Sequence, residues 1–300
     1  MSSLTDHIER LKKEKNAVIL AHNYTSFEVQ EVADYVGDSL GLSIAAVDTD
    51  ADIIVFCGVS FMGETAKILN PGKTVLLPVP EAYCAMASMC SAEQLKEYRK
   101  RNPDHLIVGY VNTTADAKAE MDVCCTSSNA LKVVESLGEK EILFVPDRNL
   151  GTYVMLKTGK KVRLWNGFCP IHHGITVSQV ENLMSKYPNA PVIAHPECRT
   201  EVLALAHHVG STEAIVRIAQ LSDSKEFIIL TEVGMIEKLE KTCPGKKFHF
   251  PSQAVCSTMK MIDLDSILNV LETGCNEVLL DPIIAKRAEM PVKKMIDITQ

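Results

Sequence analysis

The 300-residue sequence predicts an α/β fold built from three similar units around a common axis. Two observations support this prediction. The sequence matches itself three times with a period of about 86 residues, which is the signature of duplicated supersecondary units. Each copy alternates continuous apolar runs of strand length with segments of helical periodicity. This alternation is typical of parallel strands that helices cover on both faces.

The register of the repeat can be checked at four kinds of landmark. Each copy has a pair of polar residues two positions apart, then a serine, then the residue at a second strand end, then a cysteine. The landmarks are the pairs His22 and Tyr24, Tyr110 and Asn112, His195 and Glu197, the serines Ser39, Ser127 and Ser211, the strand-end residues Val59, Asp147 and Glu232, and the cysteines Cys84, Cys169 and Cys256. Because all four kinds of landmark recur in the same order and at nearly the same spacing in each copy, duplication explains them better than coincidence.

Each copy contains two apolar runs and a third, short segment that predict strands. The first runs cover residues 18–21, 106–109 and 191–194, the second 53–56, 141–145 and 227–230, and the third 74–77, 161–164 and 247–250. A helix is predicted after each repeat cysteine, over 91–101, 177–186 and 264–272, and the N-terminal stretch 2–15 resembles it. Pro103 and Pro188 end the first two of these helices. We therefore divide the chain into residues 1–105, 106–190 and 191–300, the last with a C-terminal segment.

Composition argues against two classes of partner. The net charge of -7 and a pI near 5.8 argue against nucleic acid, because neutralising phosphates needs a basic face. No run of about 18 apolar residues could span a bilayer. The first residues also lack the apolar core of a signal peptide. We therefore expect a cytoplasmic protein without a nucleic-acid or membrane partner.

The ten cysteines are better explained by metal binding or burial than by disulfides, because the cytoplasm keeps thiols reduced. Core packing is predicted for three of them in or beside apolar segments, Cys57, Cys124 and Cys125. Repeat equivalence distinguishes Cys84, Cys169 and Cys256, because symmetry places equivalent residues around one axis. Three converging thiolates predict a metal site with one open position, in either a tetrahedral zinc or a four-iron cluster.

The polar pairs lie where the first strand of each unit ends. Ligands of parallel sheets bind beyond the carboxyl ends of strands. Residues two apart in an extended segment point to the same side, so each pair can face the axis and supply proton donors and acceptors. The three repeat serines each open a helical stretch as N-caps, and helix N-termini also bind anions. The sequence therefore predicts small, multiply anionic ligands.

The segments LAHNY, VGDSL, YVN, CTSSNA, PDRNLG, HPEC and VGST, with the three repeat cysteines, closely resemble the quinolinate synthase (NadA) family over essentially the whole chain. The resemblance implies three αβα sandwich domains related by pseudo-threefold symmetry. It also implies a transferase of de novo NAD biosynthesis that condenses iminoaspartate with dihydroxyacetone phosphate to quinolinate, phosphate and water. The family's [4Fe-4S] cluster maps to Cys84, Cys169 and Cys256, and its fourth iron stays open as a Lewis acid for substrate.

The resemblance further implies the residues of the active site. Catalytic positions map to Tyr24, Tyr110, His195 and Glu197, and substrate-binding positions map to His22, Ser39, Asn112, Ser127, Ser211 and Thr212. In this scheme Ser211 and Thr212 hold the phosphate, and the proton transfers on the triose fall to Tyr24, His195 and Glu197. Some family members carry a CxxCxxC motif in the last domain. This chain has only Cys256 there, so no disulfide switch based on that motif is expected. The expected partners are the two anionic metabolites, with room for a transient contact to the enzyme that makes iminoaspartate.

Two other functions stay open at this point. A zinc hydrolase could use the same three thiolates, with Glu197 activating a bound water. A non-catalytic sensor could use an oxygen-labile iron-sulfur cluster to report iron or redox state. It would, however, have no use for six inward polar residues and three anion sites. Iron, sulfide and quinolinate formation measured under anaerobic conditions separate the three functions.

Overall fold

The computed structural model describes residues 3–299, so Ser2, the first residue of the predicted N-terminal helix, lies outside them. Three four-stranded sheets form within this range. In spatial order, the first sheet contains β2 (Tyr35–Gly37), β1 (Ala17–His22), β3 (Ile53–Cys57) and β4 (Thr74–Leu76). The second contains β6 (Val123–Cys125), β5 (Leu106–Tyr110), β7 (Ile142–Val145) and β8 (Val162–Leu164). The third contains β10 (His208–Val209), β9 (Val192–Ala194), β11 (Glu226–Leu230) and β12 (Lys247–His249).

The three sheets share one topology. Every strand pair in them is parallel, and the spatial order of the strands is the same in each. This repetition confirms the predicted α/β fold of three units with small parallel sheets. The prediction missed one strand per unit, β2, β6 and β10. Each has only two or three residues and pairs on one side, so it leaves no apolar run long enough to be recognised.

Helices follow the strands in every unit. They are α1 (Leu4–Glu14), α2 (Phe27–Val32), α3 (Ser39–Asp48), α4 (Ser60–Leu69), α5 (Ala92–Arg101), α6 (Ala115–Lys118), α7 (Ala130–Glu135), α8 (Arg148–Thr158), α9 (Pro170–His173), α10 (Val177–Lys186), α11 (Thr200–Leu203), α12 (Thr212–Leu221), α13 (Met235–Thr242), α14 (Leu264–Thr273) and α15 (Pro282–Thr299). The three helices predicted after the repeat cysteines are confirmed as α5, α10 and α14. Among residues 3–299, no helix combines the length and the apolar character that crossing a membrane requires.

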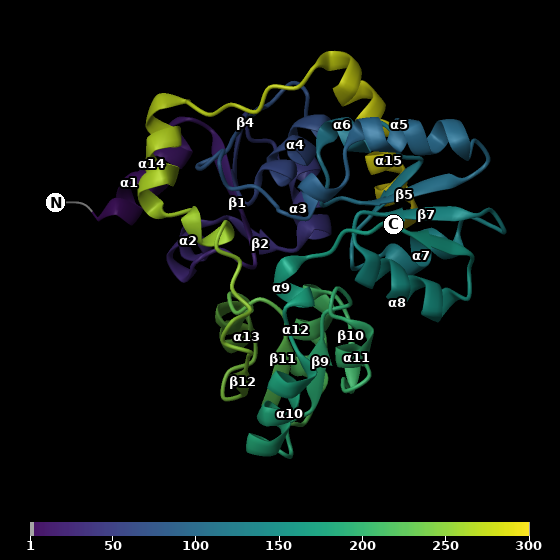
Figure 1. Cartoon of the computed structure of the whole chain (residues 1–300). Coiled ribbons are helices and arrows are strands. Elements are labelled where there is room, and N and C mark those ends of the chain that lie inside the picture. Colours follow the sequence, from purple (N-terminus) through teal and green to yellow (C-terminus); the bar gives the residue numbers. More distant parts are fainter. Residues whose placement is uncertain (1–2, 300) are drawn as a thin grey trace.

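The helix after each repeat cysteine packs on the next unit. α5 contacts α6, α10 contacts α11, and α14 returns to pack against α1 at the first unit. Figure 1 shows α14 and α1 side by side, although they lie near opposite ends of the chain. Their contact buries Ile8, Leu11, Ile267 and Val270 in one cluster. The crossing helices therefore close the three units into a ring around their common axis.

Apolar burial fixes the strands and the segments next to them. The core of β1, Ile19 to Ala21, is fully buried, because helices cover both faces of its sheet. The core packing predicted for Cys57, Cys124 and Cys125 is confirmed, since none of the three is exposed.

α15 lies across the second unit and contacts β6, α4, α6 and α7, which ties the C-terminal segment to the middle of the chain.

Candidate active site

The sheets turn their carboxyl ends toward one cavity of about 260 Å³. β1 ends at His22, β5 ends at Tyr110, and His195 directly follows β9. With one exception, the residues predicted for the site line this cavity: His22, Tyr24, Ser39, Cys84, Tyr110, Asn112, Ser127, Cys169, His195, Glu197, Thr212 and Cys256. The exception, Ser211, is buried beside Thr212. The cavity thus collects predicted residues from all three units.

The three repeat cysteines open on the cavity from the loops that follow β4, β8 and β12. All three are free thiols and are partly exposed. Burial raises the pKa of Cys84 to about 12, opposed by the backbone amides of Ala87 and Met86. Burial and the Glu197 carboxylate raise the pKa of Cys169. These two thiols are therefore protonated at neutral pH in the metal-free protein, which argues against nucleophilic catalysis, because the thiolate is the nucleophile.

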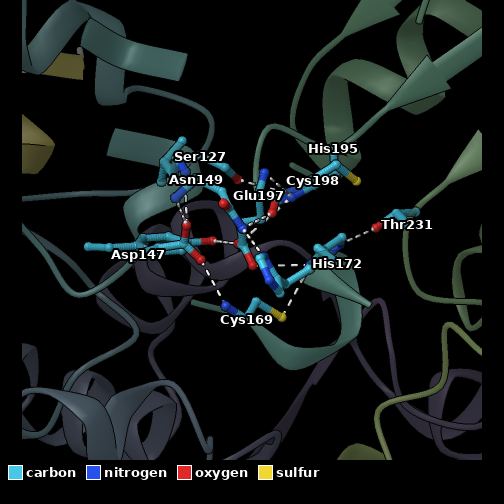
Figure 2. Close-up of polar contacts among 12 residues, drawn as sticks. Ser127, Asp147, Asn149, Cys169, His172, His195, Glu197, Cys198 and Thr231 are labelled. Carbon is cyan, nitrogen blue, oxygen red and sulfur yellow. Dashed lines mark hydrogen bonds and ion pairs between the residues drawn. The ribbon is translucent and has the colours of Figure 1, made fainter. Parts of the chain in front are cut away.

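Glu197 lies at the centre of the polar network of the cavity, as Figure 2 shows. Its side chain is buried. Oε1 accepts a 2.5 Å hydrogen bond from the Tyr110 hydroxyl, and Oε2 lies 3.1 Å from Nδ1 of His172. Burial opposes ionisation, but His172 and the Tyr110 hydrogen bond help to outweigh it, and the pKa of Glu197 is about 2. Glu197 is therefore a carboxylate at neutral pH.

His172 and Thr231 extend this network to Tyr24. Nε2 of His172 lies 2.9 Å from Oγ1 of Thr231, and the Tyr24 hydroxyl lies 2.9 Å from the same oxygen. Thr231 can donate to the imidazole while it accepts from the tyrosine. A continuous hydrogen-bond chain therefore connects Tyr24 with Glu197 and, through it, with Tyr110.

Sequence reasoning missed His172 and Thr231. His172 lies on α9, three residues after Cys169, and its ring stacks on His195 with 4.4 Å between centroids. The repeat gives no signal for it, because the equivalent positions hold Ala87 and Met259. The Cys-Pro-x-His spacing around α9 was the one local signal that could have pointed to His172.

The two strand-end histidines share one protonation state. The backbone N–H groups two residues later, in Tyr24 and Glu197, lie 3.2 and 3.4 Å from Nδ1 of His22 and His195. This network assigns the ring hydrogen of each histidine to Nε2. Burial lowers the pKa of both histidines to about 3, so both rings are neutral at pH 7. Nε2 of His195 faces the hydroxyl of Ser127 at 3.2 Å.

One of the three predicted serine caps is present. Ser211 caps α12 and accepts the Ala214 amide at 3.4 Å. For the other two the N-cap prediction was wrong. Asp38 caps α3, which makes Ser39 the first helical residue, and α7 begins after Asn129, which leaves Ser127 in the preceding turn. Asp and Asn favour the cap position as strongly as Ser, so a nearby serine is not decisive.

Asn112 presents an unpaired polar atom at the cavity. Among residues 3–299, its buried Oδ1 has no hydrogen-bond partner. Buried polar atoms are normally paired, so this oxygen indicates a place for a ligand donor. Asp38 lines the same cavity and accepts a 2.5 Å hydrogen bond from Ser128. Burial raises the pKa of Asp38, so this second carboxyl group takes up a proton more readily than an exposed one.

Comparisons with known proteins identify the family. Residues 6–297 match the model of the quinolinate synthetase A protein, NadA. The chain is 46% identical to the quinolinate synthase of Prosthecochloris aestuarii, with 100% of this chain and 95% of the relative covered. It is 50% identical to that of Methanoregula boonei, with 98% and 97% covered, and 47% identical to that of Aquifex aeolicus, with 100% and 95% covered. The chain therefore belongs to the quinolinate synthase family, enzymes of NAD biosynthesis.

Proposed function

We propose that the protein condenses iminoaspartate with dihydroxyacetone phosphate to quinolinate, with release of phosphate and two waters. One observation carries this proposal. Three repeat-equivalent cysteines open on the same cavity as Tyr24, Glu197 and the neutral imidazole of His195. A metal site and proton-transferring side chains therefore share one small space. The names of the relatives support quinolinate as the product.

The residues of the cavity fit a [4Fe-4S] cluster held by Cys84, Cys169 and Cys256. Among residues 3–299, one group of three side chains is compact enough to hold a single metal ion. It consists of Cys169, His172 and Glu197, whose ligand atoms all lie within 4.8 Å of one another. The three cysteine sulfurs are therefore spread more widely than the ligands of one ion. Cluster ligands bind different iron atoms and stand further apart, and thiolates are the ligands that such clusters take. When bound, the cluster supplies one iron without a protein ligand, a Lewis acid for a substrate oxygen.

The compact trio favours zinc as the alternative cofactor. Sulfur, nitrogen and oxygen donors at short range are a common zinc set. Against it, Glu197 and His172 already bond to each other, and their remaining atoms bond to Tyr110 and Thr231. These contacts describe a satisfied proton network rather than free ligands.

The substrates together carry two carboxylates and one phosphate. We assign the phosphate to Ser211 and Thr212, at the start of α12, where free backbone amides and the helix dipole favour an anion. The carboxylates fall to the hydroxyls of Ser39 and Ser127 and to Nε2–H of His22. The unpaired oxygen of Asn112 is an acceptor for the nitrogen or a hydroxyl of the substrate.

Proton transfers fall to the hydrogen-bonded groups of the cavity. Glu197 is ionised and accepts, whereas Tyr24, Tyr110 and His195 hold protons that they can donate. The hydroxyl groups of Tyr24 and Tyr110 stay protonated at neutral pH, because burial first and Glu197 next raise the pKa of both. The Glu197 carboxylate also fixes the orientation of the His172 ring through the contact between Oε2 and Nδ1.

One anaerobic experiment tests the proposal. Protein purified and reconstituted without oxygen is expected to contain about four irons and four sulfides per chain. It is also expected to form quinolinate from dihydroxyacetone phosphate and freshly generated iminoaspartate. Cys169→Ala is expected to abolish both. Zinc without sulfide would favour the hydrolase, and a full cluster without quinolinate would favour a sensor.

Location and partners follow from this chemistry. We place the protein in the cytoplasm, with small anionic metabolites as its partners. Iminoaspartate is unstable in water, so a transient contact with the enzyme that produces it would shorten its exposure.

A further inference from the structure

The three cysteine loops share one main-chain contact. In each unit, the residue after the strand-end landmark donates its backbone N–H to the carbonyl two residues before the cysteine. These bonds run from Ser60 to Ala82, from Arg148 to Gly167 and from Val233 to Ala254, at 2.8, 2.9 and 2.9 Å. They attach each loop to the end of β3, β7 or β11, but they do not hold the cysteine itself.

Two of the cysteines have an additional contact. The backbone N–H of Cys169 donates to Oδ2 of Asp147 at 3.0 Å. The backbone N–H of Cys256 donates to Oε1 of Glu232, also at 3.0 Å. Asp147 and Glu232 occupy the same position in the repeat, and neither side chain is exposed. The same contact has therefore been built twice, with side chains of different length.

Both carboxylates are also fixed at their other oxygen. Oδ1 of Asp147 accepts the amides of Asn149 and Leu150 at the start of α8, at 2.7 and 2.8 Å. Oε2 of Glu232 accepts the Gly234 amide at 2.6 Å, and Lys260 lies 3.3 Å from Oε1. Each carboxylate is thus a rigid link between a strand end and a cysteine.

The first unit has no such link, because Val59 occupies the equivalent position. An apolar side chain cannot accept the amide of Cys84. The loop of Cys84 keeps the shared contact from Ser60 to Ala82 and a turn in which the Ala87 amide donates to the Cys84 carbonyl at 3.0 Å. The three cysteines are therefore held unequally, although the units that carry them are alike.

We propose that Asp147 and Glu232 are positioning residues that hold Cys169 and Cys256 in place for the metal centre, while Cys84 is the adjustable third ligand. This inference rests on the proposed cluster. Two ligands fixed in advance lower the ordering cost of binding, because less conformational freedom is lost when the metal arrives. An adjustable third ligand accommodates the centre as it is inserted.

The carboxylates also affect the electrostatics of the centre. Each accepts an amide N–H that would otherwise be free to donate to a cysteine sulfur. Hydrogen bonds to sulfur and the net charge around a cluster set its reduction potential. Removal of either carboxylate is therefore expected to raise the midpoint potential. A purely structural role would leave the potential unchanged.

The test replaces each carboxylate with the residue that the first unit uses. Glu232→Val and Asp147→Val are compared with wild type for the rate at which an iron chelator removes the cluster without oxygen. We expect about tenfold faster loss in each variant, because the buried cysteine amide loses its acceptor, and leaving a buried donor unpaired is costly enough for a factor of about ten. Glu232→Gln keeps an acceptor oxygen and is expected to fall between wild type and Glu232→Val. It also provides a usable variant if a valine variant does not fold.

Asp263→Ala is the matched control. The Asp263 carboxylate also accepts a backbone amide, that of Ser266 at 2.8 Å, but it caps the exposed start of α14 and is not bonded to a repeat cysteine. Cluster loss and midpoint potential are expected to equal those of wild type in this variant. Equal acceleration in Asp263→Ala and Glu232→Val, or wild-type loss and potential in both valine variants, would overturn the proposal.

Hydrogen exchange in the metal-free protein separates this inference from the proposed function. The Cys256 amide is expected to exchange about tenfold faster in Glu232→Val than in wild type. The amide of Phe248 on β12 is expected to be unchanged. If wild type binds no iron and sulfide, the proposed cluster fails, yet this exchange ratio still tests the link. An unchanged Cys256 amide would refute the link even in a protein with a full cluster.

Discussion

Replacing Glu197 with glutamine tests the centre of the proposed chemistry. The substitution keeps the size of the side chain and removes its charge. Tyr110 and His172 both donate to this carboxylate. An amide has one acceptor oxygen, so one of the two donors would face an NH₂ group. The loss of a hydrogen bond to a charged group costs about 1.5–3 kcal/mol. The loss of a general acid-base group lowers turnover by about 10²–10⁴-fold. We therefore expect a fall in kcat of about 10²–10⁴-fold.

The assay measures quinolinate formation without oxygen, together with iron and sulfide content. Metal content is expected to stay at the wild-type level, because Glu197 is not one of the three proposed cluster ligands. Glu226→Gln is the matched control, since Glu226 also pairs with a histidine, His249, at 3.3 Å, but outside the cavity. Turnover of Glu197→Gln equal to that of Glu226→Gln, at equal cluster content, would remove Glu197 from the mechanism.

Three further predictions follow. Thr231→Val breaks the hydrogen-bond chain between Tyr24 and His172, so kcat is expected to fall by about tenfold or more at unchanged iron content. The control variant Thr242→Val, in α13, is expected to leave kcat unchanged. The pKa of His195 is about 3 in the folded protein and about 6.5 in the unfolded chain. As the pH falls from 7 to 5, this histidine therefore takes up a proton only in the unfolded state, and its contribution lowers the free energy of unfolding by about 2 kcal/mol. Urea unfolding of metal-free His195→Asn should show a flatter pH dependence, and an equal slope would contradict the burial argument. A Cβ at Gly109 would lie 1.8 Å from the Met121 sulfur, so Gly109→Ala is expected to cost about 1–3 kcal/mol in urea unfolding, unlike Gly72→Ala, which meets nothing within 4 Å.

Much of the fold could be predicted from local patterns. The three strands predicted in each unit became β1, β3 and β4 in the first, β5, β7 and β8 in the second, and β9, β11 and β12 in the third. The inner strands of each sheet were the most readable, because burial between two helical layers requires apolar residues. The helix predicted over 177–186 coincides with α10, whose capping box at Thr176 and Gln179 marks its start. The edge strands β2, β6 and β10 escaped prediction, because two or three residues carry no periodicity. The division of the chain near residues 105 and 190 stays a prediction.

The candidate site was partly readable because the repeat marks equivalent positions. Polar residues at His22, Tyr110 and His195 recur at strand ends, and their side chains line one cavity. The repeat cannot mark a residue that occurs in one unit alone, and His172 is such a residue. The serine at 127 shows the converse. It was predicted as a helix cap from its place in the repeat, yet the helix after it starts at Ala130, with Asn129 as its N-cap.

The sequence by itself determined the threefold repeat, the strands other than β2, β6 and β10, and the long helices, because these depend on residue type and spacing along the chain. It also singled out three cysteines among ten as predicted metal ligands. The tertiary structure decided which side chains meet. His172, which comes from a different element, helps to keep Glu197 ionised against the effect of burial, whereas burial keeps His195 neutral. The contacts of Asp147 and Glu232 with cysteine amides likewise join segments more than 20 residues apart. Hydrogen bonds and pKa values depend on distance and burial in space, and those quantities exist only once the chain has folded.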